Sequence, residues 1–218
     1  MISTAKTVIL VVQLVGTFGI MFFIENTLIA LCMMLILWFV TFFPFTKQEL
    51  VVFILACFFY TLGDVLVLNQ GIFYFSDTDI LGMPYYEPFM WGFYFLHTMR
   101  MLGGSSPKQA LPGLIFSFIV VATLAYFSNT QLVSWLLIAI VLGGLLVFRT
   151  QKDFEYVIYL LGFGLVLEYA GTYFGEWTYS IDNYVLWWVA TWALSGLILY
   201  RTILPVSIWL VGEGKSGK

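Results

Sequence analysis

Three acidic residues stand inside apolar stretches of the chain, where an uncompensated charge is costly: Asp64, Glu87 and Glu168. No lysine or arginine stands at the same depth in these stretches to neutralise them. Apolar surroundings favour the neutral form of an acid, and a neutral carboxylic acid in an apolar pocket can donate a proton. We therefore predict that these three residues are catalytic. The alternative is that each carboxyl group hydrogen-bonds to a neighbouring helix and serves only packing.

Glu87 stands at the start of a predicted helix, between Pro84 and Pro88. Proline suits the first turn of a helix, where a missing N–H group removes no hydrogen bond. Helical spacing places Trp91 and Tyr94 on the same face as Glu87. Aromatic ring faces stabilise a cation without supplying a nucleophile, so this face is typical of a site that forms a carbocation. Ordinary helix packing and an interfacial aromatic belt explain the same pattern.

The composition requires a membrane around these residues. Of 218 residues, 61% are hydrophobic, 20% are aromatic and only 10% are charged, whereas soluble domains carry about a quarter of charged residues. A spanning helix needs about 20 mostly apolar residues. The pattern predicts an all-α, polytopic membrane protein of about eight transmembrane helices, near 7–24, 27–43, 49–68, 85–103, 110–127, 131–148, 155–173 and 184–204.

The charged residues predict the orientation of these helices. Threading eight spans from a cytoplasmic N-terminus places every basic residue on the cytoplasmic side: Lys6, Lys47, Arg100, Lys108, Arg149, Lys152, Arg201, Lys215 and Lys218. The outer loops then carry only acids: Glu25, Asp77, Asp79, Glu176 and Asp182. This partition follows the positive-inside rule. It predicts a multi-pass protein of the cell (cytoplasmic) membrane with both termini in the cytoplasm.

Polar and glycine residues recur in the two halves of the chain at an offset of 104 residues. The matched positions are Thr46-Lys47-Gln48-Glu49 with Thr150-Gln151-Lys152-Asp153, Asp64 with Glu168, Gly71 with Gly175, Phe73 with Trp177, Phe75 with Tyr179, Ser76 with Ser180, and Gly92 with Gly196. We therefore predict two four-helix repeats, 1–104 and 105–218. Because four spans are an even number, the repeats run parallel, and Asp64 and Glu168 face a cleft between them.

The sequence lacks the residues that several classes of protein need for their function. No basic stripe indicates nucleic-acid binding. A single histidine, two cysteines inside apolar segments (Cys32 and Cys57) and a solvated Asp77-x-Asp79 loop favour no metal site. No mid-span lysine is present to hold retinal, and the repeated Asp-rich motifs of membrane prenyltransferases are absent. We expect neither a metal nor a cofactor, and these patterns specify no oligomeric state.

The first half resembles the integral-membrane lycopene cyclases of bacteria, archaea and fungi. In that family an acid precedes a glycine by seven residues, an aromatic residue follows by two, and Pro-x-Glu-Glu begins the next helix. Asp64, Gly71, Phe73, Pro84 and Glu87 match this pattern, whereas Tyr86 replaces the first glutamate.

The same stretch is similar to bacterioruberin-type carotenoid hydratases, on the residues Gly82, Pro84, Pro88 and Trp91. In the second half, Glu168, Gly175, Trp177 and Tyr179 match the acid, glycine and aromatic part of both patterns. The second half has no Pro-x-x-Glu, and Trp188 and Thr191 stand at the matched positions.

The resemblance implies an enzyme of isoprenoid or carotenoid metabolism that protonates a terminal C=C of a long apolar polyene. Ring closure or capture by water would follow. Glu87 would be the acid, and Asp64 and Glu168 a second acid, a base or orienting groups. The residues implied to contact an isoprenoid or lipid-like substrate are Trp91, Tyr94, Phe73, Trp177, Tyr179 and Tyr86. The alternatives are a non-enzymatic membrane protein and a proton-coupled small-molecule transporter built from parallel repeats.

Overall fold

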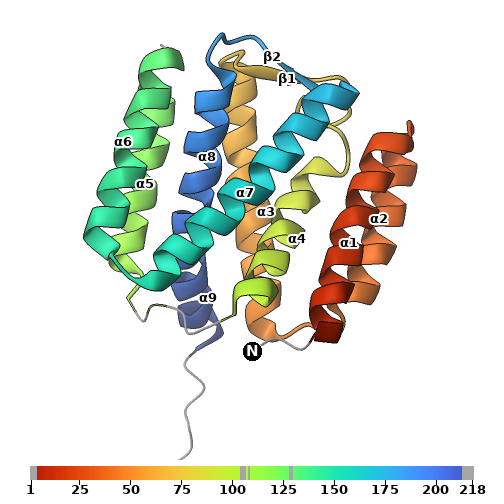
Figure 1. Ribbon diagram of the computed structural model, residues 1–218, viewed down its shortest axis with the longest axis horizontal. Coiled ribbons are helices and arrows are strands. Elements are labelled where there is room, and N and C mark those ends of the chain that lie inside the picture. The colour runs from red at the N-terminus through yellow and green to blue at the C-terminus, as the bar shows by residue number, and fades with distance from the viewer. Residues whose placement is uncertain (1–3, 104–106, 108, 128–129, 213–218) are drawn as a thin grey trace, which may run out of the picture.

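The computed structural model describes residues 4–103, 107, 109–127 and 130–212. The described residues form a helix bundle with one small two-stranded sheet at one end (Figure 1). The elements are α1 (Thr4–Phe23), α2 (Thr27–Phe42), α3 (Lys47–Asn69), β1 (Phe73–Phe75), α4 (Glu87–Leu102), α5 (Leu111–Tyr126), α6 (Thr130–Phe148), α7 (Gln151–Phe174), β2 (Trp177–Tyr179), α8 (Tyr184–Ile198), the π-helix η1 (Leu199–Ile203) and α9 (Leu204–Val211). The all-α prediction is confirmed.

Each predicted span corresponds to a helix of the structure, with α8, η1 and α9 forming one continuous helix. Five stretches are long and apolar enough to cross a membrane: Lys6–Phe23, Lys47–Asn69, Thr130–Phe148, Gln151–Phe174 and Tyr184–Val211. Large apolar side chains cover the outside of the bundle, and Val40, Phe58, Phe118 and Val147 are all at least 72% exposed. Such an exterior suits lipid rather than water. The chain is therefore a candidate multi-pass membrane protein.

Helix α4 differs from the long helices because it lies in the interior of the bundle. It has only 16 residues, and most of its middle section is buried, from Met90 to Thr98. Its main neighbour is α3, while α7 packs mainly against α8 (Figure 1). The α1–α2 hairpin packs on the outside of this group. Glu87 thus opens a helix that other helices enclose.

Helices α3 and α7 begin with the same local structure. The Thr46 hydroxyl accepts from the Glu49 backbone N–H, and the Glu49 carboxyl accepts from the Thr46 backbone N–H. Thr150 and Asp153 form the same reciprocal pair at the start of α7. Such a capping box satisfies two N–H groups that the first turn of a helix leaves free. The two stretches with matching sequence therefore also match in structure.

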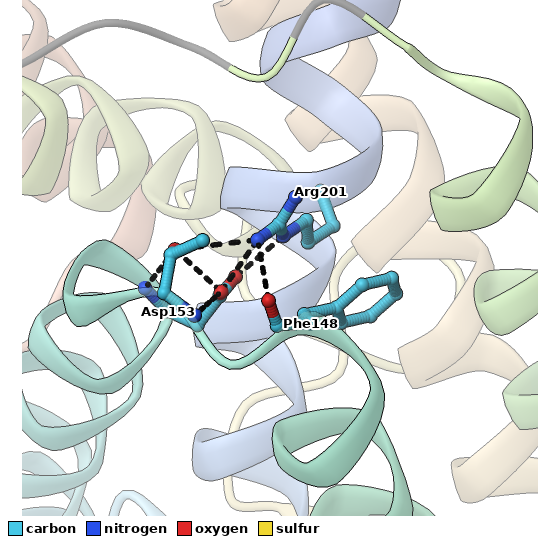
Figure 2. Close-up of polar contacts among 4 residues, drawn as sticks. Phe148, Asp153 and Arg201 are labelled. Carbon is cyan, nitrogen blue, oxygen red and sulfur yellow. Dashed lines mark hydrogen bonds and ion pairs between the residues drawn. The ribbon is translucent and has the colours of Figure 1, made fainter.

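Each capping acid also binds an arginine from a later helix. Arg201 Nε donates to Asp153 at 2.5 Å, and its guanidinium group lies 4.7 Å from the centre of the Phe148 ring (Figure 2). Arg100 Nε donates to Glu49 at 2.6 Å. Each arginine also donates to a backbone carbonyl group of the preceding helix end, Phe148 or Phe42. We call these two arrangements the arginine clasps.

The described basic residues gather at the end of the bundle away from the sheet. Lys47 and Lys152 stand in the first turns of α3 and α7, Arg149 follows α6, and the arginine clasps lie at the same end. The first turn of α1, which contains Lys6, and the end of α9 also lie at this end (Figure 1). Lys108, Lys215 and Lys218 lie outside the described residues.

A short sheet, which the sequence did not predict, joins the two halves. Strands β1 and β2 pair antiparallel, with Phe73 opposite Tyr179, Tyr74 opposite Thr178, and Phe75 opposite Trp177. The central pair, Tyr74 and Thr178, joins two positions that the 104-residue offset matches, so the pairing of the strands has local two-fold symmetry. The sheet closes one end of the bundle, at the top of Figure 1.

Candidate functional site

A cavity of about 150 Å³ lies between α3, α4, α5, α7 and α8, next to the sheet. The three acids predicted from the sequence all line it: Asp64 from α3, Glu87 from α4 and Glu168 from α7. One water needs only about 10–15 Å³ of such space, so the cavity accepts a larger group. Within the described residues, no lysine or arginine lines it. The fold therefore brings together acids that are far apart in the sequence.

Tryptophan side chains hold two of the acids in place. The Asp64 carboxyl accepts from Trp91 Nε1 at 2.7 Å. The Glu168 carboxyl accepts from Trp192 Nε1 at 2.9 Å, and also from Trp177 Nε1 at 2.9 Å and the Tyr179 hydroxyl at 2.8 Å. The indole N–H groups can only donate, so they bond to a carboxylate or to the carbonyl oxygen of an acid and orient both groups.

The carboxyl group of Glu87 has no such hydrogen bonds from the described residues. Glu87 is 8% exposed, and within the described part of the chain no side chain or backbone group donates to its carboxyl group. Asp64 and Glu168 are close enough to interact with it electrostatically. A buried carboxyl group without a donor has nothing to stabilise a negative charge. Of the three acids, Glu87 is the one that the surroundings leave free to transfer a proton.

Aromatic rings form most of the cavity wall. Trp91 lies 5.1 Å from Trp192 and 6.3 Å from Tyr94 between ring centres. Phe73 and Tyr179 close the end beneath the sheet, 5.5 Å apart. The predicted substrate-contact residues Trp91, Tyr94, Phe73, Trp177 and Tyr179 all line the cavity. These rings present electron-rich faces to any cation formed among them.

Tyr86, the remaining predicted contact residue, does not line the cavity. Its hydroxyl group donates to the Glu176 carboxyl at 3.0 Å, and Glu176 does not line the cavity either. Glu176 lies between α7 and β2, in a segment predicted only as an outer loop. Nothing in the local sequence marks Glu176 as a partner of Tyr86, because the contact joins the two halves.

The cavity lining also contains residues with polar side-chain groups that were not among the predicted site residues, including Tyr60, Thr191, Trp192 and Ser195. Tyr60 could have been found, because it stands one helical turn before Asp64 and so shares its face. Thr191 and Ser195 are also one turn apart, on α8. Their spacing alone does not show which face of that apolar helix lines a cavity.

The predicted offset of 104 residues is wrong for the fourth helix of each half, α4 and α8. It matched Gly92 with Gly196, whereas the contacts match Trp91 with Trp192 and Arg100 with Arg201. The chain between β1 and Trp91 is three residues longer than the chain between β2 and Trp192. By these contacts, the position that corresponds to Glu87 is Trp188, not Thr191.

Gly164 sets the position of Trp192. A Cβ atom added at Gly164 would lie 1.9 Å from the Trp192 ring. We expect Gly164→Ala to push Trp192 away from Glu168 and to lower the free energy of unfolding by about 1–3 kcal/mol. Thermal unfolding in detergent and tryptophan fluorescence measure the two effects. Gly162→Ala is the control, since no atom lies within 4 Å of its added Cβ. Equal effects of the two substitutions would contradict the assignment.

Glu176 predicts a pH dependence of stability. Burial raises the pKa of Glu176, the Tyr86 hydroxyl acts in the opposite direction, and the charge of Asp77 raises it further. The folded protein therefore holds this proton more tightly than the unfolded chain does, so stability falls as the pH rises above about 4.3.

The variant that tests this pH dependence is Glu176→Gln, which removes the titrating proton and keeps an acceptor for the Tyr86 hydroxyl. We expect its midpoint of thermal unfolding to fall less than that of the wild type between acidic and neutral pH. Asp182→Asn removes an exposed acid of the same outer region and serves as the control. An unchanged pH slope in Glu176→Gln would show that this group contributes nothing to the dependence.

No protein-family model matches the chain, and neither a curated protein nor a solved structure does. The resemblance to lycopene cyclases and carotenoid hydratases stays a prediction. The functional argument therefore depends on the geometry and chemistry of this cavity.

Proposed function

We propose that the protein is an integral membrane enzyme that protonates a terminal C=C of a long apolar polyene, of the isoprenoid or carotenoid class. The observation that carries this proposal is the buried Glu87 carboxyl group, which lines an aromatic cavity and receives no hydrogen bond from the described residues. Asp64 and Glu168 line the same cavity, and no lysine or arginine of the described part of the chain does. Three neighbouring carboxyl groups in an apolar space cannot all be ionised at acceptable cost.

The proposed reaction begins with transfer of the Glu87 proton to the terminal carbon of the double bond. The positive charge then resides on the more substituted carbon, where Trp91, Tyr94 and Trp192 stabilise it. Attack by a second double bond closes a ring, and loss of a proton to a carboxylate yields an isomer of the substrate. Attack by water yields an alcohol instead. Neither outcome consumes an oxidant, a metal or a cofactor.

A lipid-like substrate fits the surroundings of the cavity. The helices that enclose it present apolar side chains outward, so a substrate dissolved in the bilayer meets no charged barrier at their surface. The cavity accepts an end group rather than a whole polyene, and the rest of the chain would extend among the helices or into lipid.

We also infer that all eight helices span the membrane as two parallel repeats, 1–104 and 105–218, with both termini in the cytoplasm. The repeated capping boxes, arginine clasps and acid–tryptophan pairs support this. A reporter fused to the C-terminus should be active only in the cytoplasm. Activity only outside the cytoplasm would contradict this topology.

The proposed activity is tested by expressing the chain in a host that accumulates lycopene and analysing the pigments by chromatography and mass spectrometry. A new product of equal mass indicates cyclisation, and one heavier by a water indicates hydration. No new pigment, with the protein confirmed in the membrane, would contradict the proposed function. Proton flux into proteoliposomes without product would favour the transporter.

A further inference from the structure

One hydroxyl group in the cavity wall has no hydrogen-bond partner. The Tyr60 hydroxyl is buried, and no group in the described part of the chain bonds to it. It lies beside the Ser195 side chain, but outside the geometry of a hydrogen bond. Its ring is packed 4.4 Å from Trp91 and 4.8 Å from Phe95 between ring centres, so the hydroxyl cannot easily turn elsewhere. Buried polar groups are nearly always paired, and this exception calls for a ligand or a water.

Two more hydroxyl groups line the same cavity. The Thr191 hydroxyl donates to the Trp187 carbonyl group at 2.9 Å, and the Ser195 hydroxyl donates to the Thr191 carbonyl group at 2.9 Å. Their protons are therefore used within α8, while their oxygens retain lone pairs. Together, Tyr60, Thr191 and Ser195 offer one free donor and two acceptors. We call them the hydroxyl cluster.

Glu87 opens α4, whereas Thr191 and Ser195 come from α8 and Tyr60 comes from α3. The two halves can be aligned by matching Trp91 with Trp192. In this alignment, Thr191 corresponds to Met90 and Ser195 to Tyr94. Glu87 corresponds to Trp188. At the position that corresponds to Thr191, the first half therefore has the thioether of Met90 in place of a hydroxyl group.

We propose that the hydroxyl cluster binds one water molecule and that this water captures the carbocation formed by Glu87. This inference rests on the proposed function and specifies its outcome: the product is a tertiary alcohol. A water molecule both donates and accepts, so it pairs with the Tyr60 hydroxyl and with the oxygens of Thr191 and Ser195.

The atoms balance without a further reactant. Glu87 gives its proton to the terminal carbon, the water oxygen bonds to the cationic carbon, and the water then loses one proton. That proton passes to a carboxylate of the cavity. Asp64 is suited to accept it, because it stands one helical turn from Tyr60. The proton then returns to Glu87 through the neighbouring carboxyl groups. The net change is addition of one water across the C=C.

The test uses purified protein in nanodiscs, with lycopene as the probe and water enriched in heavy oxygen. The wild type should form an alcohol that carries the heavy oxygen. Tyr60→Phe removes only the unpaired hydroxyl and should lower the ratio of alcohol to cyclic product about tenfold, the effect of one hydrogen bond. Thr191→Val with Ser195→Ala should lower it further. Ser134→Ala is the control, because that buried hydroxyl bonds to its own helix on α6 away from the cavity.

Each other outcome has a distinct meaning. If the wild type forms only an unlabelled isomer, the inference is wrong and the proposed proton transfer stands. If Tyr60→Phe and the double variant make the alcohol at the wild-type ratio, the hydroxyl cluster does not hold the attacking water. If no product of either kind forms, the proposed function fails and takes this inference with it.

Discussion

Glu87→Gln is expected to lower the formation of any cyclised or hydrated product by about 10²-fold or more, the usual contribution of a positioned general acid. Glutamine has nearly the same shape but no acidic proton to give to the double bond. Because no donor binds the Glu87 carboxyl group, the substitution breaks no hydrogen bond of the described structure. The protein should therefore still insert into the membrane, and pigment analysis should show the loss against an equal amount of protein.

The matched control for this variant is Glu25→Gln, which neutralises an exposed acid between α1 and α2. It should keep full activity. Asp64→Asn should retain more activity than Glu87→Gln, since an amide oxygen still accepts from Trp91. Full activity in Glu87→Gln would remove Glu87 as the acid and would shift the role to Asp64 or Glu168.

Asp153→Ala is expected to cause the largest loss of stability, about 3–5 kcal/mol. Asp153 is completely buried, and both of its oxygens accept from Arg201, each at 2.5 Å (Figure 2). The same carboxyl group caps the first turn of α7. Its removal leaves a largely buried guanidinium group without its counter-charge and leaves the Thr150 backbone N–H, just before α7, without its acceptor. Thermal unfolding in detergent measures the loss.

Two further variants separate these effects. Glu155→Ala removes the partner of Lys152 in a partly exposed surface pair, and such pairs contribute little to stability. Combining Asp153→Ala with Arg201→Met removes both charges of the buried pair and should recover part of the stability. If Asp153→Ala were as stable as Glu155→Ala, the arginine clasp would not contribute to the fold.

The helices could be predicted from the sequence because their signals are local. An apolar run of sufficient length indicates a spanning helix, and the Thr46 and Thr150 capping boxes mark where α3 and α7 begin. The cost of a charge in an apolar segment identified the acids in the same way. These signals need no knowledge of what lies on the facing helix.

The contacts between the halves could not be predicted, because they depend on which helices meet. The β1–β2 sheet pairs segments about a hundred residues apart, and three residues per strand are too few for a clear pattern. The pairing of Tyr86 with Glu176 is equally non-local. The longer loop before Trp91 concealed its match with Trp192, since a fixed offset assumes loops of equal length.

The two kinds of acid in the cavity explain how one site could serve both steps of a proton transfer. Tryptophan donors stabilise the ionised forms of Asp64 and Glu168, which suits them to accept a proton or to orient the cation. No described residue donates to the Glu87 carboxyl group, which suits Glu87 to give a proton away. Environments that favour opposite protonation states are the usual means by which carboxyl groups divide acid and base roles.

The most direct test of this account is to run the lycopene reaction in heavy water and to measure deuterium at carbon in the product. Proton transfer to the double bond predicts one non-exchangeable deuterium for each end group that has reacted, whether the end group is cyclised or hydrated. Glu87→Gln should yield almost no such label. A product formed in heavy water without deuterium at carbon would contradict protonation as the first step, and with it the central role of Glu87.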